Sequence, residues 1–148
     1  MQTTSFEVTG GRQLSGSIVP KGAKNEALQV ICAPLLTTEK VTISNIPDIA
    51  DVRSQIELVR GLGVKVERIS HDTYSFHADE VDRNLFENKN FLGNARRIRG
   101  SVMLMGALLG RFRKALLPQP GGDKIGRRRL DTHFLGLEKL GAEFRYDA

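Results

Sequence analysis

The sequence carries one order of secondary-structure patterns twice. Residues 22–80 predict helix, strand, helix, strand and strand in the runs KGAKNEALQVICAPLLTTEK, KVTISNIP, DIADVRSQIELVRGLG, VKVERIS and TYSFHAD. Residues 90–148 begin the same order again with ARRIRGSVMLMGALLGRFRK, KALLPQ, RRLDTHFLGLEKLG and AEFRYDA. Leu35-Leu36 recurs 73 residues later as Leu108-Leu109, and Leu62-Gly63 recurs 78 residues later as Leu140-Gly141. Two copies of one unit explain both correspondences.

The second unit stops before the last strand of the pattern, where no natural domain is expected to end. We therefore expect the 148 residues to be part of a longer protein. Two alternating runs within residues 1–21, SFEVTG and LSGSIVP, predict short strands outside the repeat. In the first unit, Pro34 is expected to interrupt the first helix. Asp51 and Gly63 are expected to mark the beginning and the end of the second helix.

The remaining features exclude several classes of protein. No apolar run approaches the roughly 18 residues of a membrane span, and the start MQTTSFEVTGGRQL lacks the basic and apolar regions of a secretory signal. We therefore expect a cytoplasmic location. The single cysteine, Cys32, excludes an intrachain disulfide, and its apolar neighbours predict a buried thiol. His71, His77 and His133 lack metal-ligand spacing, so neither a metal nor a cofactor is expected.

The basic residues gather in two stretches, 94–100 and 110–130, and the formal net charge is +5. A nucleic-acid surface is one explanation, and a steep salt dependence of polynucleotide binding would be its sign. Aromatic residues are only 6% of the chain, and none stands between the arginines as a stacking platform. A compact anionic ligand, such as a phosphate or a sugar nucleotide, fits the clustering better. In PQPGGDKIGRRRLD, the glycines can present Asp123 at a loop tip close to three arginines.

Five motifs in order resemble the enolpyruvyl transferase family, in its branch that acts on UDP-N-acetylglucosamine. They are GAKNEAL at 22–28, NIPDIADV at 45–52, RRIRGSVMLMGALLGRF at 96–112, PGGDKIGRRRLDTH at 120–133 and GLEKLGAEF at 136–144. Asn25 separates this branch from the shikimate-pathway branch, in which GSKS is expected. The resemblance covers essentially the whole sequence, about the first third of a family member.

The resemblance implies an α/β fold of the inside-out type, in which repeated helix-strand-helix-strand-strand units place helices in the middle and sheets outside. This domain would be incomplete here, with units at 22–80 and 90–148. Residues 1–21 would belong to a second domain, and the isolated chain would be inactive and marginally stable. The family aspartate that deprotonates the sugar hydroxyl, and a further arginine that contacts phosphoenolpyruvate, would also lie outside these residues.

The implied activity is a carboxyvinyl transfer in peptidoglycan synthesis. The enolpyruvyl group of phosphoenolpyruvate passes to the 3-hydroxyl of UDP-N-acetylglucosamine, and phosphate is released. Catalytic roles fall on Lys24 and Asp123, and phosphoenolpyruvate contacts on Lys24 and Arg128. The implied contacts to UDP-N-acetylglucosamine are Asn25, Arg99, Arg128, Arg129, Leu130 and Asp131.

Two positions depart from the family pattern. Asp123 stands where most members have the cysteine that fosfomycin alkylates; some members carry aspartate and are active, so we expect activity that resists fosfomycin. Arg129 replaces a usual proline, which makes the uridine contacts less certain than the phosphate contacts. Arg96 and Arg97 lie close enough in sequence to be confused with Arg99. A catalytically silent paralogue that binds UDP-sugars is the alternative.

Overall fold

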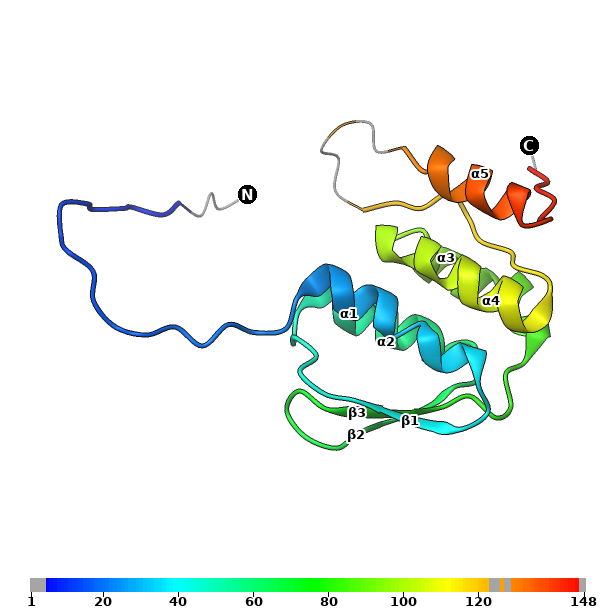
Figure 1. Cartoon of the computed structure of the whole chain (residues 1–148), viewed down its shortest axis with the longest axis horizontal. Helices are drawn as coiled ribbons and strands as arrows, with labels where there is room; N and C mark the ends of the chain where they lie inside the picture. Colours follow the sequence, from blue (N-terminus) through cyan, green and yellow to red (C-terminus); the bar gives the residue numbers. More distant parts are fainter. Residues whose placement is uncertain (1–4, 123–125, 127–128, 147–148) are drawn as a thin grey trace.

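The computed structural model describes residues 5–122, 126 and 129–146. Figure 1 shows a small sheet beneath helices α1 and α2, with α3, α4 and α5 on the opposite side of these two helices. The elements in chain order are α1 (Lys24–Val30), η1 (Ala33–Leu36), β1 (Lys40–Ile43), α2 (Ala50–Arg60), β2 (Lys65–Arg68), β3 (Tyr74–His77), η2 (Arg83–Glu87), α3 (Lys89–Ala95), η3 (Arg99–Met103), α4 (Leu104–Phe112) and α5 (Asp131–Lys139), where η marks a 3-10 helix.

The first predicted helix is interrupted at Pro34, as expected. The α-helix ends at Val30, and a 3-10 turn begins at Ala33 with the proline near its start. Proline has no N–H to donate to the preceding helical turn, so the chain tightens there. The apolar side chains of this segment still share one buried face, formed by Ala27, Leu28, Ile31, Cys32 and Leu35.

The second helix also follows its sequence pattern. Asp51 lies in the first turn of α2, as predicted, and the helix ends at Arg60, three residues before Gly63. The apolar residues at helical spacing, Val52, Ile56 and Val59, are at most 3% exposed. This face of α2 therefore packs into the hydrophobic core.

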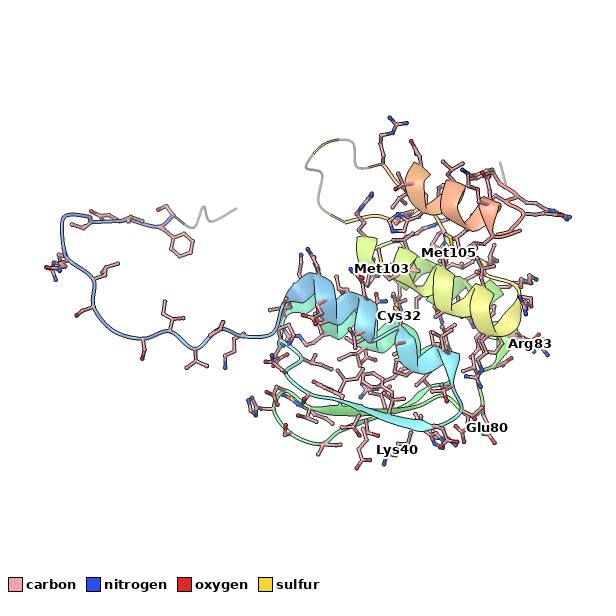
Figure 2. All side chains as sticks on the ribbon, viewed as in Figure 1. Cys32, Lys40, Glu80, Arg83, Met103 and Met105 are labelled. Atoms are coloured by element: carbon pink, nitrogen blue, oxygen red, sulfur yellow. The ribbon has the colours of Figure 1, made fainter. Side chains whose placement is uncertain are left out.

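The three strands form an antiparallel sheet in the order β1-β3-β2. Phe76 stands at the centre, paired with Val41 on one side and Val66 on the other, and it is fully buried. Since side chains alternate along a strand, the neighbouring row that contains Lys40 and Lys65 faces away from the helices. Figure 2 shows Lys40 on the side of the sheet that faces away from the helices. The sheet therefore contributes one apolar face to the core and one polar face to solvent.

The first helix predicted for the second unit is broken into separate segments in the structure. One helical run was predicted over 95–114, but α3 ends at Ala95, and Ile98 is extended, with φ −124° and ψ 141°. The chain then continues through η3 into α4. Ile98 is itself buried, so packing of its side chain favours the break over a continuous helix.

The strands predicted for 1–21, KALLPQ and AEFRYDA were wrong for the residues that the structure describes. Residues 5–21, 114–119 and 142–146 contain no strand. A strand requires hydrogen-bonding partners on a neighbouring chain segment, and the described ranges pair only β1, β2 and β3. Ala115, Leu116 and Leu117 instead pack against the core from an irregular segment.

One partly buried arginine joins elements of the two units. Nη1 of Arg111, on α4, donates to the carbonyl oxygens of Leu35 at 3.1 Å, Thr37 at 3.1 Å and Ala78 at 2.7 Å. Leu35 lies in the last turn of η1, Thr37 directly follows it, and Ala78 directly follows β3. The guanidinium therefore fixes α4 against the end of η1 and the end of the sheet.

Replacing Arg111 with methionine should destabilise the protein that contains this chain by about 2 kcal/mol, because three carbonyl oxygens lose a charged donor. Urea unfolding, followed by circular dichroism, measures the change. Arg113→Met is the matched control, because Arg113 is exposed. Equal unfolding midpoints for the two variants would contradict the role assigned to Arg111.

Candidate active site

Three of the helices begin at the same side of the molecule. Figure 1 shows the first residues of α1, of the η3–α4 segment and of α5 facing the same way. Lys24 opens α1, Arg99 opens η3 and Asp131 opens α5. The structure therefore directs the starts of the segments that carry several sequence-predicted site residues toward one side.

Lys24 lies against the beginning of α2. Its Nζ donates to Oδ2 of Asp51 at 2.9 Å, and both side chains are about half exposed, at 47% and 45%. Asn25 follows in the same first turn and is exposed. The ammonium group is therefore held by a carboxylate and still open to solvent.

A glycine contact brings these two helix starts together. A Cβ atom on Gly22 would lie 1.9 Å from the carbonyl oxygen of Asn45, closer than any side chain permits. Asn45 adopts a left-handed conformation with φ 58°, which asparagine tolerates better than most residues. Glycine at position 22 thus allows the backbone before α1 to lie directly on the turn before α2.

Gly100 lets the segment that begins with Arg99 pack closely against α1. A Cβ atom on Gly100 would lie 3.2 Å from both terminal carbons of Leu28, which is one helical turn from Lys24. Arg99 is half-buried at the start of η3, while Arg96 and Arg97 are exposed at the end of α3. Of the three arginines that sequence could not separate, Arg99 is the one next to the residue packed on α1.

The loop that carries the remaining predicted residues begins next to this group. A Cβ atom on Gly121 would lie 1.9 Å from the carbonyl oxygen of Arg96, so the loop backbone rests on the chain just before η3. Asp123 and Arg128 lie outside the described residues. Arg129 donates to Asp131 in the first turn of α5, Leu130 between them is half-buried, and His133 is exposed.

Sequence reasoning identified Asp51 only as a helix start and overlooked its contact with Lys24. The two residues are 27 positions apart, so no local pattern reports the pair. Its only sequence signal is an acidic residue at the start of a helix that follows the lysine-bearing helix. Within the described residues, no cluster of histidine, cysteine and carboxylate groups is arranged to hold a metal ion. No helix there is long and apolar enough to cross a bilayer.

Cys32 is buried, as predicted, and has hydrogen-bonding partners. Its Sγ donates to the carbonyl oxygen of Leu28 at 3.3 Å and accepts from Nε2 of Gln55 at 3.0 Å. Burial raises the pKa of the thiol to about 12, against a smaller lowering by Gln55. Figure 2 shows Cys32 within the helical layer. The thiol is therefore protonated at neutral pH and lies away from the candidate site's surface.

Comparison with known proteins gives consistent matches. Residues 8–148 match the family model of EPSP synthase (3-phosphoshikimate 1-carboxyvinyltransferase). A UDP-N-acetylglucosamine 1-carboxyvinyltransferase from Bacteroides thetaiotaomicron is 59% identical over 143 residues, which are 97% of this chain and 33% of the relative. The enzyme of that name from Porphyromonas gingivalis is 52% identical over 96% of the chain and 33% of its own length. The chain thus spans about a third of these relatives.

A solved structure supports the fold. The enolpyruvyl transferase NikO from Streptomyces tendae matches with a TM-score of 0.54 and 30% sequence identity, over 70% of this chain and 23% of that one. This match and the family match support the incomplete enolpyruvyl transferase-like α/β fold that the resemblance implied. The strands expected in the second unit are absent from the described residues.

Iodoacetamide at pH 8 should leave Cys32 unmodified in the folded protein and should modify it in concentrated urea. Because the folded pKa is about 12 and the ordinary value is 9.0, the unfolded thiol ionises first as pH rises. The stability that this thiol contributes is complete below pH 9 and falls between pH 9 and 12. Mass spectrometry of the peptide that carries Cys32 measures the labelling. Rapid labelling of the folded protein at pH 8 would show that the thiol is accessible.

Proposed function

This chain belongs to the EPSP synthase family of carboxyvinyltransferases, and on that basis we propose that the protein containing it transfers the enolpyruvyl group of phosphoenolpyruvate to UDP-N-acetylglucosamine. Of the two substrates, the sugar nucleotide is suggested by the names of relatives that are 52–59% identical. The observation that carries the proposal is the position of Lys24 and of the Arg99 segment at one side of the molecule, where the 118–122 segment also arrives.

The reaction places specific demands on a site. C3 of phosphoenolpyruvate gains a proton, the 3-hydroxyl oxygen of the sugar attacks C2, and the tetrahedral intermediate loses phosphate as the proton leaves C3 again. Both substrates carry phosphate groups, and phosphoenolpyruvate also carries a carboxylate. Cations must therefore be fixed close together, with a group that can move a proton beside them.

Lys24 and Arg99 suit the cationic part of this chemistry. The Lys24 ammonium has three donors and gives one to Asp51, which leaves two for phosphoenolpyruvate or the intermediate. Arg99 would reach the phosphates of the nucleotide, to which a guanidinium can donate two parallel hydrogen bonds. Asn25, in the first turn of α1, would bind the reacting sugar through its amide.

The 118–133 segment would complete the site. Arg128 would bind the phosphate of phosphoenolpyruvate, and Asp123 would move the proton in place of the usual cysteine. The backbone of Arg129, Leu130 and Asp131 would hold the uracil ring, with the Arg129–Asp131 contact in place of the rigidity of a proline. The base that deprotonates the sugar hydroxyl would come from the rest of the protein.

This activity would make the protein an enzyme of peptidoglycan synthesis that acts in the cytoplasm, where both substrates are available. Cell-wall biogenesis, cell shape and cell division would then depend on it. In the complete protein, residues 1–21 would join a second domain, and the units at 22–80 and 90–148 would belong to the first.

Phosphate release from phosphoenolpyruvate by the full-length protein tests the proposal. We expect release only when UDP-N-acetylglucosamine is also present, because the sugar oxygen must attack before phosphate can leave. Replacing Lys24 with alanine should lower kcat/KM for phosphoenolpyruvate by about 100-fold or more, as for loss of a charge that contacts the transition state. A folded protein that binds the sugar nucleotide and releases no phosphate would instead be a silent paralogue.

Fosfomycin should not inactivate the full-length protein, and Asp123→Cys should make it sensitive. A carboxylate attacks an epoxide far more slowly than a thiolate does. Cys32 offers no alternative target in this chain because it is buried and protonated. Residual activity after timed preincubation measures inactivation, and mass spectrometry locates the adduct. Time-dependent loss of wild-type activity with an adduct on Asp123 would refute this expectation.

A further inference from the structure

We propose that Asp51 is a positioning residue that fixes the Lys24 ammonium for phosphoenolpyruvate. The inference rests on the proposed function, in which Lys24 contacts that substrate. Oδ2 of Asp51 accepts from Lys24 Nζ at 2.9 Å across two helix starts. Lysine has a long and flexible side chain, so an unrestrained ammonium would lose much rotational freedom when it binds an anion. A carboxylate partner removes part of that freedom before the substrate arrives.

The carboxylate of Asp51 is itself on a well-supported segment. The turn before α2 is pressed on Gly22 at one end, and the backbone N–H of Ile46 donates to the carbonyl oxygen of Asp72 at 2.8 Å. The tip of the β2–β3 hairpin therefore holds this turn from the side opposite α1. These contacts fix the start of α2 relative to both neighbours.

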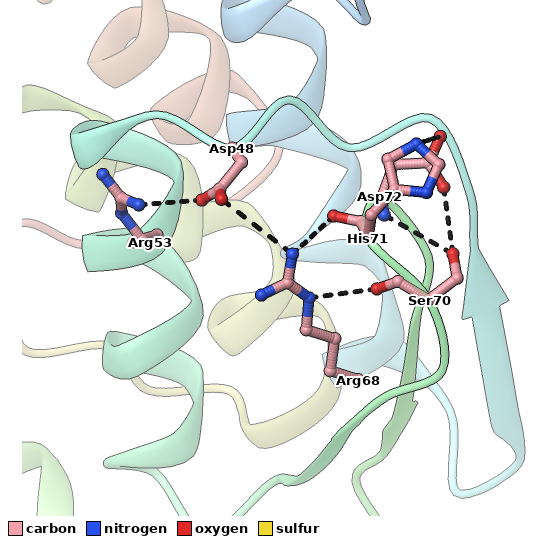
Figure 3. Close-up of polar contacts among 6 residues, drawn as sticks. All are labelled: Asp48, Arg53, Arg68, Ser70, His71 and Asp72. Atoms are coloured by element: carbon pink, nitrogen blue, oxygen red, sulfur yellow. Dashed lines mark hydrogen bonds and ion pairs between the residues drawn. The ribbon is translucent and has the colours of Figure 1, made fainter.

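Figure 3 shows the polar cluster that completes this support. Oδ1 of Asp48 accepts from Arg53 at 3.0 Å, and Oδ2 lies 3.9 Å from Nη2 of Arg68. The same Arg68 donates to the backbone carbonyl oxygens of Ser70 at 3.0 Å and His71 at 2.7 Å. One arginine thus links the hairpin tip to the residue three positions before Asp51. These contacts connect the start of α2 to the tip of the β2–β3 hairpin.

A simpler explanation for Asp51 is a favourable interaction with the helix dipole, since acidic residues stabilise the first turn of a helix. That explanation requires no partner, whereas Lys24 lies at hydrogen-bond distance. The equivalent helix of the second unit, α5, also has an acidic residue in its first turn, Asp131, which accepts from Arg129. Asp51 differs in its partner, because it pairs with the lysine that opens α1.

The test uses the full-length protein with three substitutions. In Asp51→Asn, the KM for phosphoenolpyruvate should rise about tenfold, the loss expected for one charge-assisted hydrogen bond, while the KM for UDP-N-acetylglucosamine stays within about twofold. Loss of a negative charge near an anionic substrate would by itself lower this KM, so a rise identifies positioning. Asp51→Glu keeps the carboxylate, so its KM for phosphoenolpyruvate should return most of the way to the wild-type value.

Glu57→Gln is the matched control, because Glu57 is an exposed carboxylate on the same helix that pairs with Arg60 instead. It should leave both KM values unchanged, and all variants should melt within a few degrees of wild type. Absence of sugar-dependent phosphate release in the wild type would overturn the proposed function and this inference with it. An active wild type with an unchanged or lowered KM in Asp51→Asn, or no recovery in Asp51→Glu, would overturn the inference alone.

Discussion

Two close backbone contacts, each made possible by a glycine, organise the candidate site. Gly22 lets the chain before α1 lie on the turn that follows β1, and Gly121 lets the chain that follows the KALLPQ segment lie on the chain before η3. In the first contact the glycine precedes α1, and in the second it follows residues 114–119, which form no strand. The repeat thus preserves a contact between equivalent places while its residues differ. Each contact lies just before a helical segment, at whose start Lys24 or Arg99 lies.

The hydrophobic core is well formed around the first unit and thin around the last helix. Phe76, Leu35 and Leu108 are fully buried, whereas α5 has no buried residue, although Phe134 contacts Phe144 with ring centres 5.1 Å apart. Apolar side chains along residues 5–21 are almost fully exposed, Phe6 at 94% among them. Such surface is costly in water. Relatives three times as long have further chain with which these side chains could pack.

Local signals in the sequence predicted much of the first unit, and non-local pairing explains most of the errors. Pro34 and the apolar spacing of α2 act within a few residues, so they could be read directly. Strand pairing depends on a distant segment, and the KALLPQ run has none within the described residues. The start of α3 could have been found, because Asn88 caps it by accepting from the N–H of Asn90. In the site, the family resemblance indicated Lys24, while its contact with Asp51 depends on tertiary structure.

The arrangement of the arginines weighs against the nucleic-acid surface that the net charge suggested. Arg111 is directed into backbone carbonyls, Arg53 and Arg68 converge on Asp48, and Arg129 pairs with Asp131. A side chain engaged in this way is less available to a polynucleotide, whose binding depends on many cations neutralising successive phosphates. The positive charge near the helix starts is confined to a small area, and the carboxylate of Asp51 neutralises part of it. A small anion with several oxygens can use such a site, because a few well-directed donors are enough to bind it.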